Sequence, residues 1–175
     1  DHAVNRLDVE IDDLCIRLLA LRQPAARDLR FITTALKITT DLERIGDMAV
    51  NISERALELA DVPPLKPYID VPRMAEIAAR MLRQSLDAFV REDTELALDV
   101  CRSDDEVDAL NGQIFRELLS FMIEDPHTIT RAMGVLFVSK YLERIADHAT
   151  NIAEMVIFMV KGKSIRHVDE LPPTV

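Results

Sequence analysis

One block of eleven residues occurs twice in this sequence, and the duplication limits the folds that the chain can adopt. Residues 42–52 read LERIGDMAVNI and residues 142–152 read LERIADHATNI, so eight of the eleven positions are identical. Two unrelated amphipathic helices would share mainly their apolar positions. Here the polar positions match too: Glu43 with Glu143, Arg44 with Arg144, Asp47 with Asp147, and Asn51 with Asn151. We therefore interpret the chain as two copies of one unit.

A second matching pair of segments precedes the two blocks. The pattern Arg-x-Asp-x-Glu-x-Asp-x-Leu at residues 6–14 recurs at residues 102–110, an offset of 96 residues. In the second unit a helix-like segment at about residues 72–91 comes before this pattern, whereas only a few residues precede it in the first unit. We therefore expect that about one helix, on the order of 30 residues or more, is missing from the front of the first unit, and that the intact arrangement is two three-helix units.

The spacing of apolar residues predicts an all-α fold with five helices. Apolar residues recur every three or four positions over about residues 1–22, 24–59, 72–91, 94–123 and 127–161. The small share of glycine, with 4 residues, and of aromatic side chains, at 5%, disfavours an all-β fold. Long helices joined by short turns pack as antiparallel neighbours, so the sequence predicts helical bundles.

Prolines mark the expected domain boundary. Four of the eight prolines lie within residues 61–72, a stretch that no helix is expected to cross. We assign residues 1–61 to a partial first repeat, 62–72 to a Pro-rich linker, 73–163 to the second repeat and 164–175 to a C-terminal tail. Gly162 is expected to cap the last helix.

The charge balance disfavours several classes of partner. The chain has 31 acidic and 21 basic residues, a net charge of -10, so we expect it to repel nucleic acid and anionic lipid. The longest apolar run, at about residues 153–160, is interrupted by Glu154 and is too short to insert into a membrane. Cys15 and Cys101 are too few and too far apart for a disulfide framework, so we expect both thiols to be buried in a protein of the reducing cytoplasm.

Four pairs of acidic residues suggest cation binding. Side chains four residues apart lie on one face of a helix, with Cβ atoms roughly 6 Å apart, so paired carboxylates repel each other unless a cation offsets them. The oxygen ligands suit Mg, Mn, Ca or Fe, and Zn less well. If the helices pack antiparallel, each unit gathers four carboxylates, with an asparagine one turn further along. The first set is Asp8, Asp12, Glu43, Asp47 and Asn51, and the second is Asp104, Asp108, Glu143, Asp147 and Asn151.

Two alternative interpretations of these carboxylates stay open. An isolated Glu-x-x-x-Asp pair usually lies on a solvated face, and Arg44 and Arg144 could form ordinary salt bridges in an acidic seam that binds no metal. A carboxylate-bridged metalloenzyme of the di-iron type would add a Glu-x-x-His motif, which none of the four carboxylate segments contains. His148 follows Asp147 directly and lies about 100° around the helix from it, so we do not expect it to bind metal.

The two blocks, with the flanking residues 28–30 and 160–167, resemble the PhoU family of phosphate-transport regulatory proteins. The resemblance covers essentially the whole chain, with Ala146 in place of the usual glycine. It implies two tandem three-helix bundles, and multinuclear metal sites built from the paired (Glu/Asp)-x-x-x-Asp motifs. By motif match these sites fall on the two sets named above, with the asparagines as supporting ligands and Fe, Mn, Mg or Zn as the metal.

The resemblance also implies a function. Members of the family are not known as enzymes, and they act as cytoplasmic negative regulators of phosphate uptake and phosphate-starvation signalling. They are thought to link the ATPase subunit of the ATP-driven phosphate (ABC) transporter to a membrane sensor histidine kinase, and they often form homodimers. We expect this chain to reach the inner membrane through these protein partners. Regulation of an ion-coupled phosphate carrier stays open as an alternative.

Overall fold

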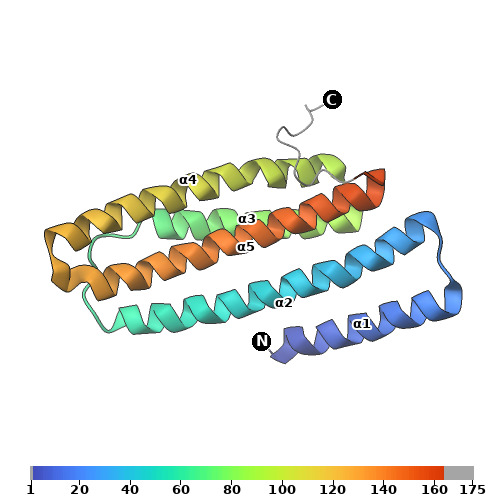
Figure 1. Cartoon of the computed structure of the whole chain (residues 1–175), viewed down its shortest axis with the longest axis horizontal. Coiled ribbons are helices and arrows are strands. Elements are labelled where there is room, and N and C mark those ends of the chain that lie inside the picture. Colours follow the sequence, from blue (N-terminus) through green and yellow to red (C-terminus); the bar gives the residue numbers. More distant parts are fainter. Residues whose placement is uncertain (1, 164–175) are drawn as a thin grey trace.

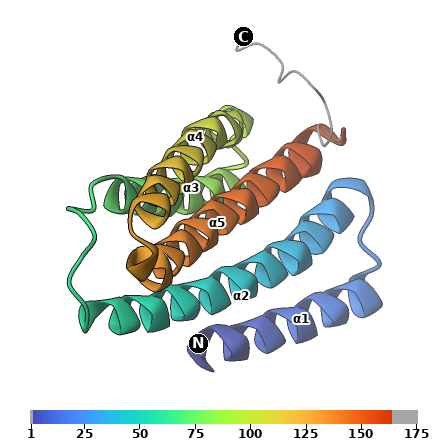
Figure 2. The same cartoon turned by 60° about the vertical axis from the view of Figure 1, so that its left-hand side comes forward.

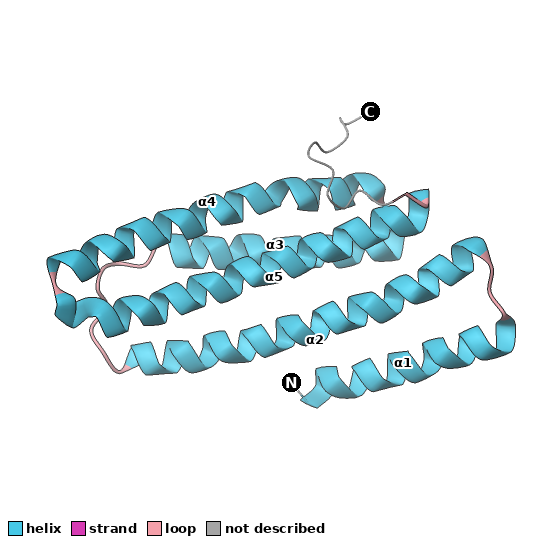
Figure 3. Ribbon diagram, viewed as in Figure 1, coloured by secondary structure: helices cyan, strands magenta, loops and turns pink. Residues whose placement is uncertain are grey.

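The structure, a computed structural model, describes residues 2–163 and is built from helices (Figures 1 and 3). No strand occurs in this range, so the all-α prediction is confirmed. The predicted tail at residues 164–175 lies outside the described residues. The elements are α1 (His2–Arg22), α2 (Ala26–Ala60), α3 (Asp70–Arg91), α4 (Thr94–Glu124), the short 3-10 helix η1 (Pro126–Thr128) and α5 (Ile129–Lys161).

Helix α5 occupies the centre of the bundle. It contacts α2 on one side and both α3 and α4 on the other, and α3 and α4 also contact each other (Figures 1 and 2). Among the described residues α1 packs against α2 alone. Helices α3, α4 and α5 therefore form a closed three-helix bundle, whereas α1 and α2 form an open pair that joins this bundle through α2.

The hydrophobic core lies between α3, α4, α5 and the inner face of α2. Burial of apolar surface in this cluster is the main force that holds the four helices together. Large side chains that are almost completely buried come from α3, α4 and α5: Met74, Met81, Leu98, Leu118, Ile152 and Ile157. Helix α1 adds little to the core, since its leucines Leu14 and Leu21 are 55% and 76% exposed.

The two cysteines differ in their burial. Cys15 of α1 is buried, as expected from the sequence. Cys101 of α4 is only partly buried, so the expectation was wrong for this residue. Burial, together with the nearby carboxylates of Glu154 and Asp104, raises the pKa of the Cys101 thiol to about 12. This thiol therefore stays protonated and unreactive at neutral pH.

Specific residues set the helix ends. Helix α3 begins at Asp70, which places Pro72 inside its first turn, where the missing N–H costs nothing. The Asp93 carboxylate caps α4 by accepting hydrogen bonds from the backbone of Glu95 and Leu96. Gly162 ends α5 with a positive φ of 68° and donates its N–H to the Phe158 carbonyl, so the predicted cap is confirmed. No helix of the described chain combines the length and the hydropathy needed to cross a bilayer.

Helices α2 and α5 run antiparallel and bring the two repeated blocks together (Figure 2). The Arg30 Nε atom near the start of α2 donates to the Met159 carbonyl oxygen near the end of α5, at 3.0 Å. Near the opposite ends, the Arg55 guanidinium lies 5.4 Å from the centre of the Phe137 ring. The blocks at 42–52 and 142–152 therefore pack against each other about an approximate twofold axis.

Candidate metal centre

The second set of predicted metal ligands gathers along the contact between α4 and α5. Asp104 and Asp108 lie on consecutive turns of α4, and Glu143 and Asp147 lie on consecutive turns of α5. Their carboxylates influence one another across the two helices. Partial burial, followed by the charges of Asp147 and Asp108, raises the pKa of Asp104 to about 6. The carboxylates of this predicted set are therefore close enough for their charges to affect one another's pKa values in the folded chain.

Two further carboxylates of this set also have raised pKa values. Burial and the neighbouring Glu143 charge raise the pKa of Asp108, and the Lys140 ammonium partly offsets this effect. Burial, Glu143 and Asp108 raise the pKa of Asp147 as well. Each group therefore holds its proton more tightly than a free aspartate does, because the ionised form is poorly solvated and surrounded by negative charge.

Glu143 is the most enclosed member of the set. Its side chain is 15% exposed and forms an ion pair with Lys140 one turn earlier on α5. The ion pair is made by the buried Oε2 atom, which forms no further hydrogen bond among the described residues. The Thr150 hydroxyl lowers the pKa of Asp104 slightly, yet its Oγ1 atom is also buried without a completed hydrogen bond. Lys140 therefore already offsets part of the Glu143 charge, and a cation bound here would have to compete with the Lys140 ammonium group.

The first set has a different electrostatic environment. Asp8 and Asp12 lie on α1, and Glu43 and Asp47 lie on the facing helix α2. The Arg44 guanidinium pairs with both α2 carboxylates, with its Nε atom 3.4 Å from Glu43 and its Nη1 atom 4.0 Å from Asp47. An arginine of the same block therefore already offsets the two α2 acids, as the alternative of an ordinary salt-bridged seam expects.

The two sets differ in how well they fit a cation. Across the described chain, no three acidic, histidine or cysteine side chains surround a common point in an arrangement that could hold a metal ion. The α4–α5 set nevertheless has the right chemistry for a hard cation, because it offers oxygen ligands alone and its carboxylates repel one another, although Lys140 would have to release Glu143. Small side-chain rotations would have to aim these oxygens at one point. In the α1–α2 set, Arg44 would also have to release Glu43 and Asp47.

The asparagines of the two sets lie one turn beyond the aspartates. Asn151 is partly buried on α5, four residues after Asp147. Asn51 lines a cavity of about 350 Å³ between α2 and α5, together with Asp47. Asn51 therefore lies at the contact between the two units, one turn beyond the first carboxylate set.

A close polar contact that sequence reasoning missed connects the two units beside this cavity. The Nδ1 atom of His148 lies 2.6 Å from the Oδ1 atom of Asp41, and both side chains are largely buried. We did not expect His148 to bind metal, and in the structure it has an aspartate partner on α2. Asp41 directly precedes the first block, but no sequence signal indicated which residue it would face.

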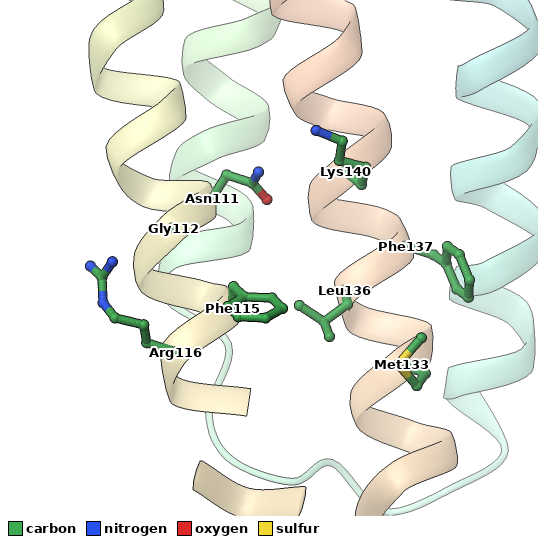
Figure 4. A pocket seen from close by; sticks show the side chains of 8 residues that line it. All are labelled: Asn111, Gly112, Phe115, Arg116, Met133, Leu136, Phe137 and Lys140. Carbon is green, nitrogen blue, oxygen red and sulfur yellow. The ribbon is translucent and has the colours of Figure 1, made fainter. Parts of the chain in front are cut away.

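A second cavity, of about 460 Å³, lies along α4 and α5 and differs in character (Figure 4). Phe115 from α4 and Leu136 from α5 point toward one another across it. Asn111, Arg116 and Lys140 supply the polar lining, which contains no acid, histidine or cysteine. This cavity therefore offers an apolar surface with a basic edge and no group that would act as a nucleophile or metal ligand.

Comparison with known proteins shows that this chain is similar to one protein family. The model of the PhoU domain family matches residues 1–56 and 71–156. A relative from Aquifex aeolicus is 48% identical over 95% of this chain and 76% of its own length. A relative from Pseudomonas putida is 43% identical over 96% of this chain, which spans 66% of that relative. Both carry the name phosphate-specific transport system accessory protein PhoU homolog.

Two crystal structures have the same fold. PhoU from Pseudomonas aeruginosa superimposes with a TM-score of 0.89 at 42% identity, over 93% of this chain and 78% of the other. The phosphate transport system regulatory protein PhoU from Streptococcus pneumoniae superimposes with a TM-score of 0.84 at 28% identity, over 94% of this chain and 77% of the other. The similarity includes both units and the way they pack, since one superposition spans nearly the whole chain.

Proposed function

Because this chain belongs to the PhoU family, we propose that it is an accessory regulator of phosphate transport that represses phosphate uptake and phosphate-starvation signalling. The main support is the 48% identity to a phosphate-specific transport system accessory protein along 95% of the chain. Both repeated blocks lie within the residues that the family model matches. Regulators of this kind act by binding other proteins, so the surfaces of the helices carry the function.

The partners that we propose are the ATPase subunit of the ATP-driven phosphate transporter and a membrane sensor histidine kinase. A chain with a net charge of -10 presents acidic helix faces that complement basic patches on other proteins. Such complementarity sets the rate and the specificity of association more than its final strength. We propose that the protein acts in the cytoplasm as a homodimer, held at the inner membrane by these partners.

We further propose that the α4–α5 carboxylates hold polyvalent cations, with Fe, Mn, Mg or Zn as candidates. Asp104, Asp108, Glu143 and Asp147 would bind the metal, and Asn151 would add a neutral oxygen. A bound cation supplies positive charge where four carboxylates now repel one another. The raised pKa of Asp104 supports this proposal, because a site built for a cation is destabilising when no cation offsets its charge. We propose the α1–α2 carboxylates with Asn51 as a second, weaker site.

A reporter assay in the bacterium that carries this gene tests the regulatory role. The reporter would be driven by a promoter that responds to phosphate starvation, and the cells would grow in phosphate-rich medium. We expect the native gene to keep the reporter silent, and deletion of the gene or the double substitution Glu143→Gln with Asp147→Asn to switch it on. The exposed α3 substitution Arg83→Gln is the matched control and should leave repression intact. Full repression after deletion of the gene would rule out the regulatory role.

A further inference from the structure

The polar cavity between α2 and α5 contains the two arginines of the repeated blocks. Arg44 and Arg144 occupy the same position in their blocks, and the antiparallel packing of the blocks places both on the wall of this one cavity. Its volume is about 350 Å³, which is large enough for a small inorganic ion with bound water. Two guanidinium groups on the wall of one cavity repel each other, and a bound anion would offset this repulsion.

The two arginines differ in how their charge is offset. Arg44 pairs with Glu43 and Asp47 on its own helix. Just before the second block, Lys140 pairs with Glu143. Thr40, two residues before the first block, is the position that corresponds to Lys140. Arg144 forms no ion pair with any residue in the described part of the chain, and its charge is available to a ligand.

The rest of the lining supplies further hydrogen-bonding groups. Tyr141 contributes a phenol, Asn51 an amide and His148 an imidazole whose Nδ1 atom already contacts Asp41. The Nη2 atom of Arg44 is not used in its contacts with Glu43 and Asp47. Arginine, tyrosine and asparagine side chains on one cavity wall supply the N–H and O–H donors that an oxyanion accepts, and Arg144 adds a charge that no ion pair offsets among the described residues.

Asp47 is the one acidic group on the cavity wall, and it narrows the choice of anion. A carboxylate repels a fully deprotonated anion such as sulfate. Orthophosphate keeps at least one proton at neutral pH, so it can donate a hydrogen bond to this carboxylate while its other oxygens accept bonds from the arginines. The combination of two arginines with one aspartate therefore favours orthophosphate over sulfate.

We propose that the cavity between α2 and α5 is a binding site for orthophosphate, held by Arg44 and Arg144 across the approximate twofold axis of the repeat. The site would connect the two units of the chain, because each unit supplies one arginine. Occupancy would strengthen the contact between α2 and α5, since the anion offsets the repulsion between the two guanidinium groups. The proposal extends the regulatory role and does not depend on it, because binding is measured on the purified chain.

Isothermal titration calorimetry with orthophosphate and with sulfate tests the proposal. The titrations use the full chain as purified and after treatment with EDTA, so that phosphate bound to a metal is recognised. We expect one equivalent of orthophosphate to bind in both preparations, about tenfold or more tightly than sulfate. Charged hydrogen bonds of this kind are strong enough that Arg144→Gln should weaken orthophosphate binding by about tenfold or more.

The matched control is Arg83→Gln, on the exposed face of α3 outside the cavity. It should bind orthophosphate as the native chain does. Circular dichroism establishes that both variants are folded, which we expect because Arg144 is exposed and glutamine is a good helix former. Absence of saturable binding, equal binding by Arg144→Gln, equal affinity for sulfate, or binding that EDTA abolishes would each overturn the proposal.

Discussion

The imidazole of His148 and the carboxylate of Asp41 form a contact between the two units, with 2.6 Å between Nδ1 and Oδ1. The side chains are 20% and 16% exposed. In the repeat these positions correspond to Met48 and Tyr141, so the contact has no counterpart on the other side of the approximate twofold axis. The contact combines one residue of each unit, and it holds α2 against α5.

Removal of this contact should destabilise the fold. We expect His148→Ala to lower the free energy of unfolding by about 1–3 kcal/mol, because it leaves the largely buried Asp41 carboxylate without its donor. Urea unfolding followed by circular dichroism measures the change. The exposed His127 provides a matched control, and His127→Ala should change stability by less than about 0.5 kcal/mol. Equal effects of the two substitutions would contradict a stabilising role for the contact.

The raised pKa of Asp104 predicts a dependence of stability on pH. The folded chain binds this proton more tightly than the unfolded chain, because the pKa is about 6 when folded and 3.8 in the reference state. Metal-free protein should therefore lose stability as pH rises from about 4 to about 6 and lose no more through this group above that range. Since Asp104 is partly exposed, solvent screening limits the effect to about 1–2 kcal/mol.

Substitution of Asp104 should remove this dependence. In EDTA at pH 7 we expect Asp104→Asn to raise the free energy of unfolding by about 1 kcal/mol, since it removes one charge from a repelling set. Urea unfolding at pH 4, 5, 6 and 7 measures both the difference in free energy of unfolding between the variant and the native chain and the dependence of that free energy on pH. Glu76→Gln, an exposed change on α3, serves as the control. A variant less stable than the native chain at pH 7 would show that Asp104 is stabilising in its ionised form.

The cap of α4 provides an independent test of the local structure. The Asp93 Oδ1 atom accepts hydrogen bonds from the backbone N–H groups of Glu95 and Leu96, both at 3.0 Å. We expect Asp93→Ala to cost about 1 kcal/mol of stability, because both donors lose their partner. Asp93→Asn keeps a side-chain oxygen at the same position and should cost much less. If urea unfolding shows the two variants to be equally stable, the hydrogen bonds of this cap do not contribute.

Most of the fold could be predicted from the sequence because it depends on local patterns. The apolar spacing and the prolines predicted all five helices, with ends within a few residues of those observed. The start of the last helix differs, since Pro126–Thr128 forms a 3-10 turn before α5 begins at Ile129. The Asp125 side chain accepts a hydrogen bond from the His127 N–H and stabilises this turn. An apolar pattern cannot distinguish such a turn from the first turn of a helix.

The candidate site could be predicted only in part. The i, i+4 spacing placed Asp104 and Asp108 on one face of α4, and Glu143 and Asp147 on one face of α5, because that spacing depends on helix geometry alone. Contacts between the units depend on which face of α2 meets α5, and this is a property of tertiary packing. Sequence patterns therefore could not predict the pairing of His148 with Asp41 or the cavity that Arg44 and Arg144 share.

The most direct test of the central claim, that the α4–α5 carboxylates hold a cation, is calorimetric titration of EDTA-treated chain with Mn²⁺, Fe²⁺, Mg²⁺ and Zn²⁺. We expect saturable binding of at least one of these ions by the native chain and by Glu76→Gln. The double variant Asp104→Asn with Asp147→Asn should bind that ion about tenfold or more weakly, because it loses two of four charged ligands. No binding by the native chain, or equal binding by the double variant, would contradict the claim.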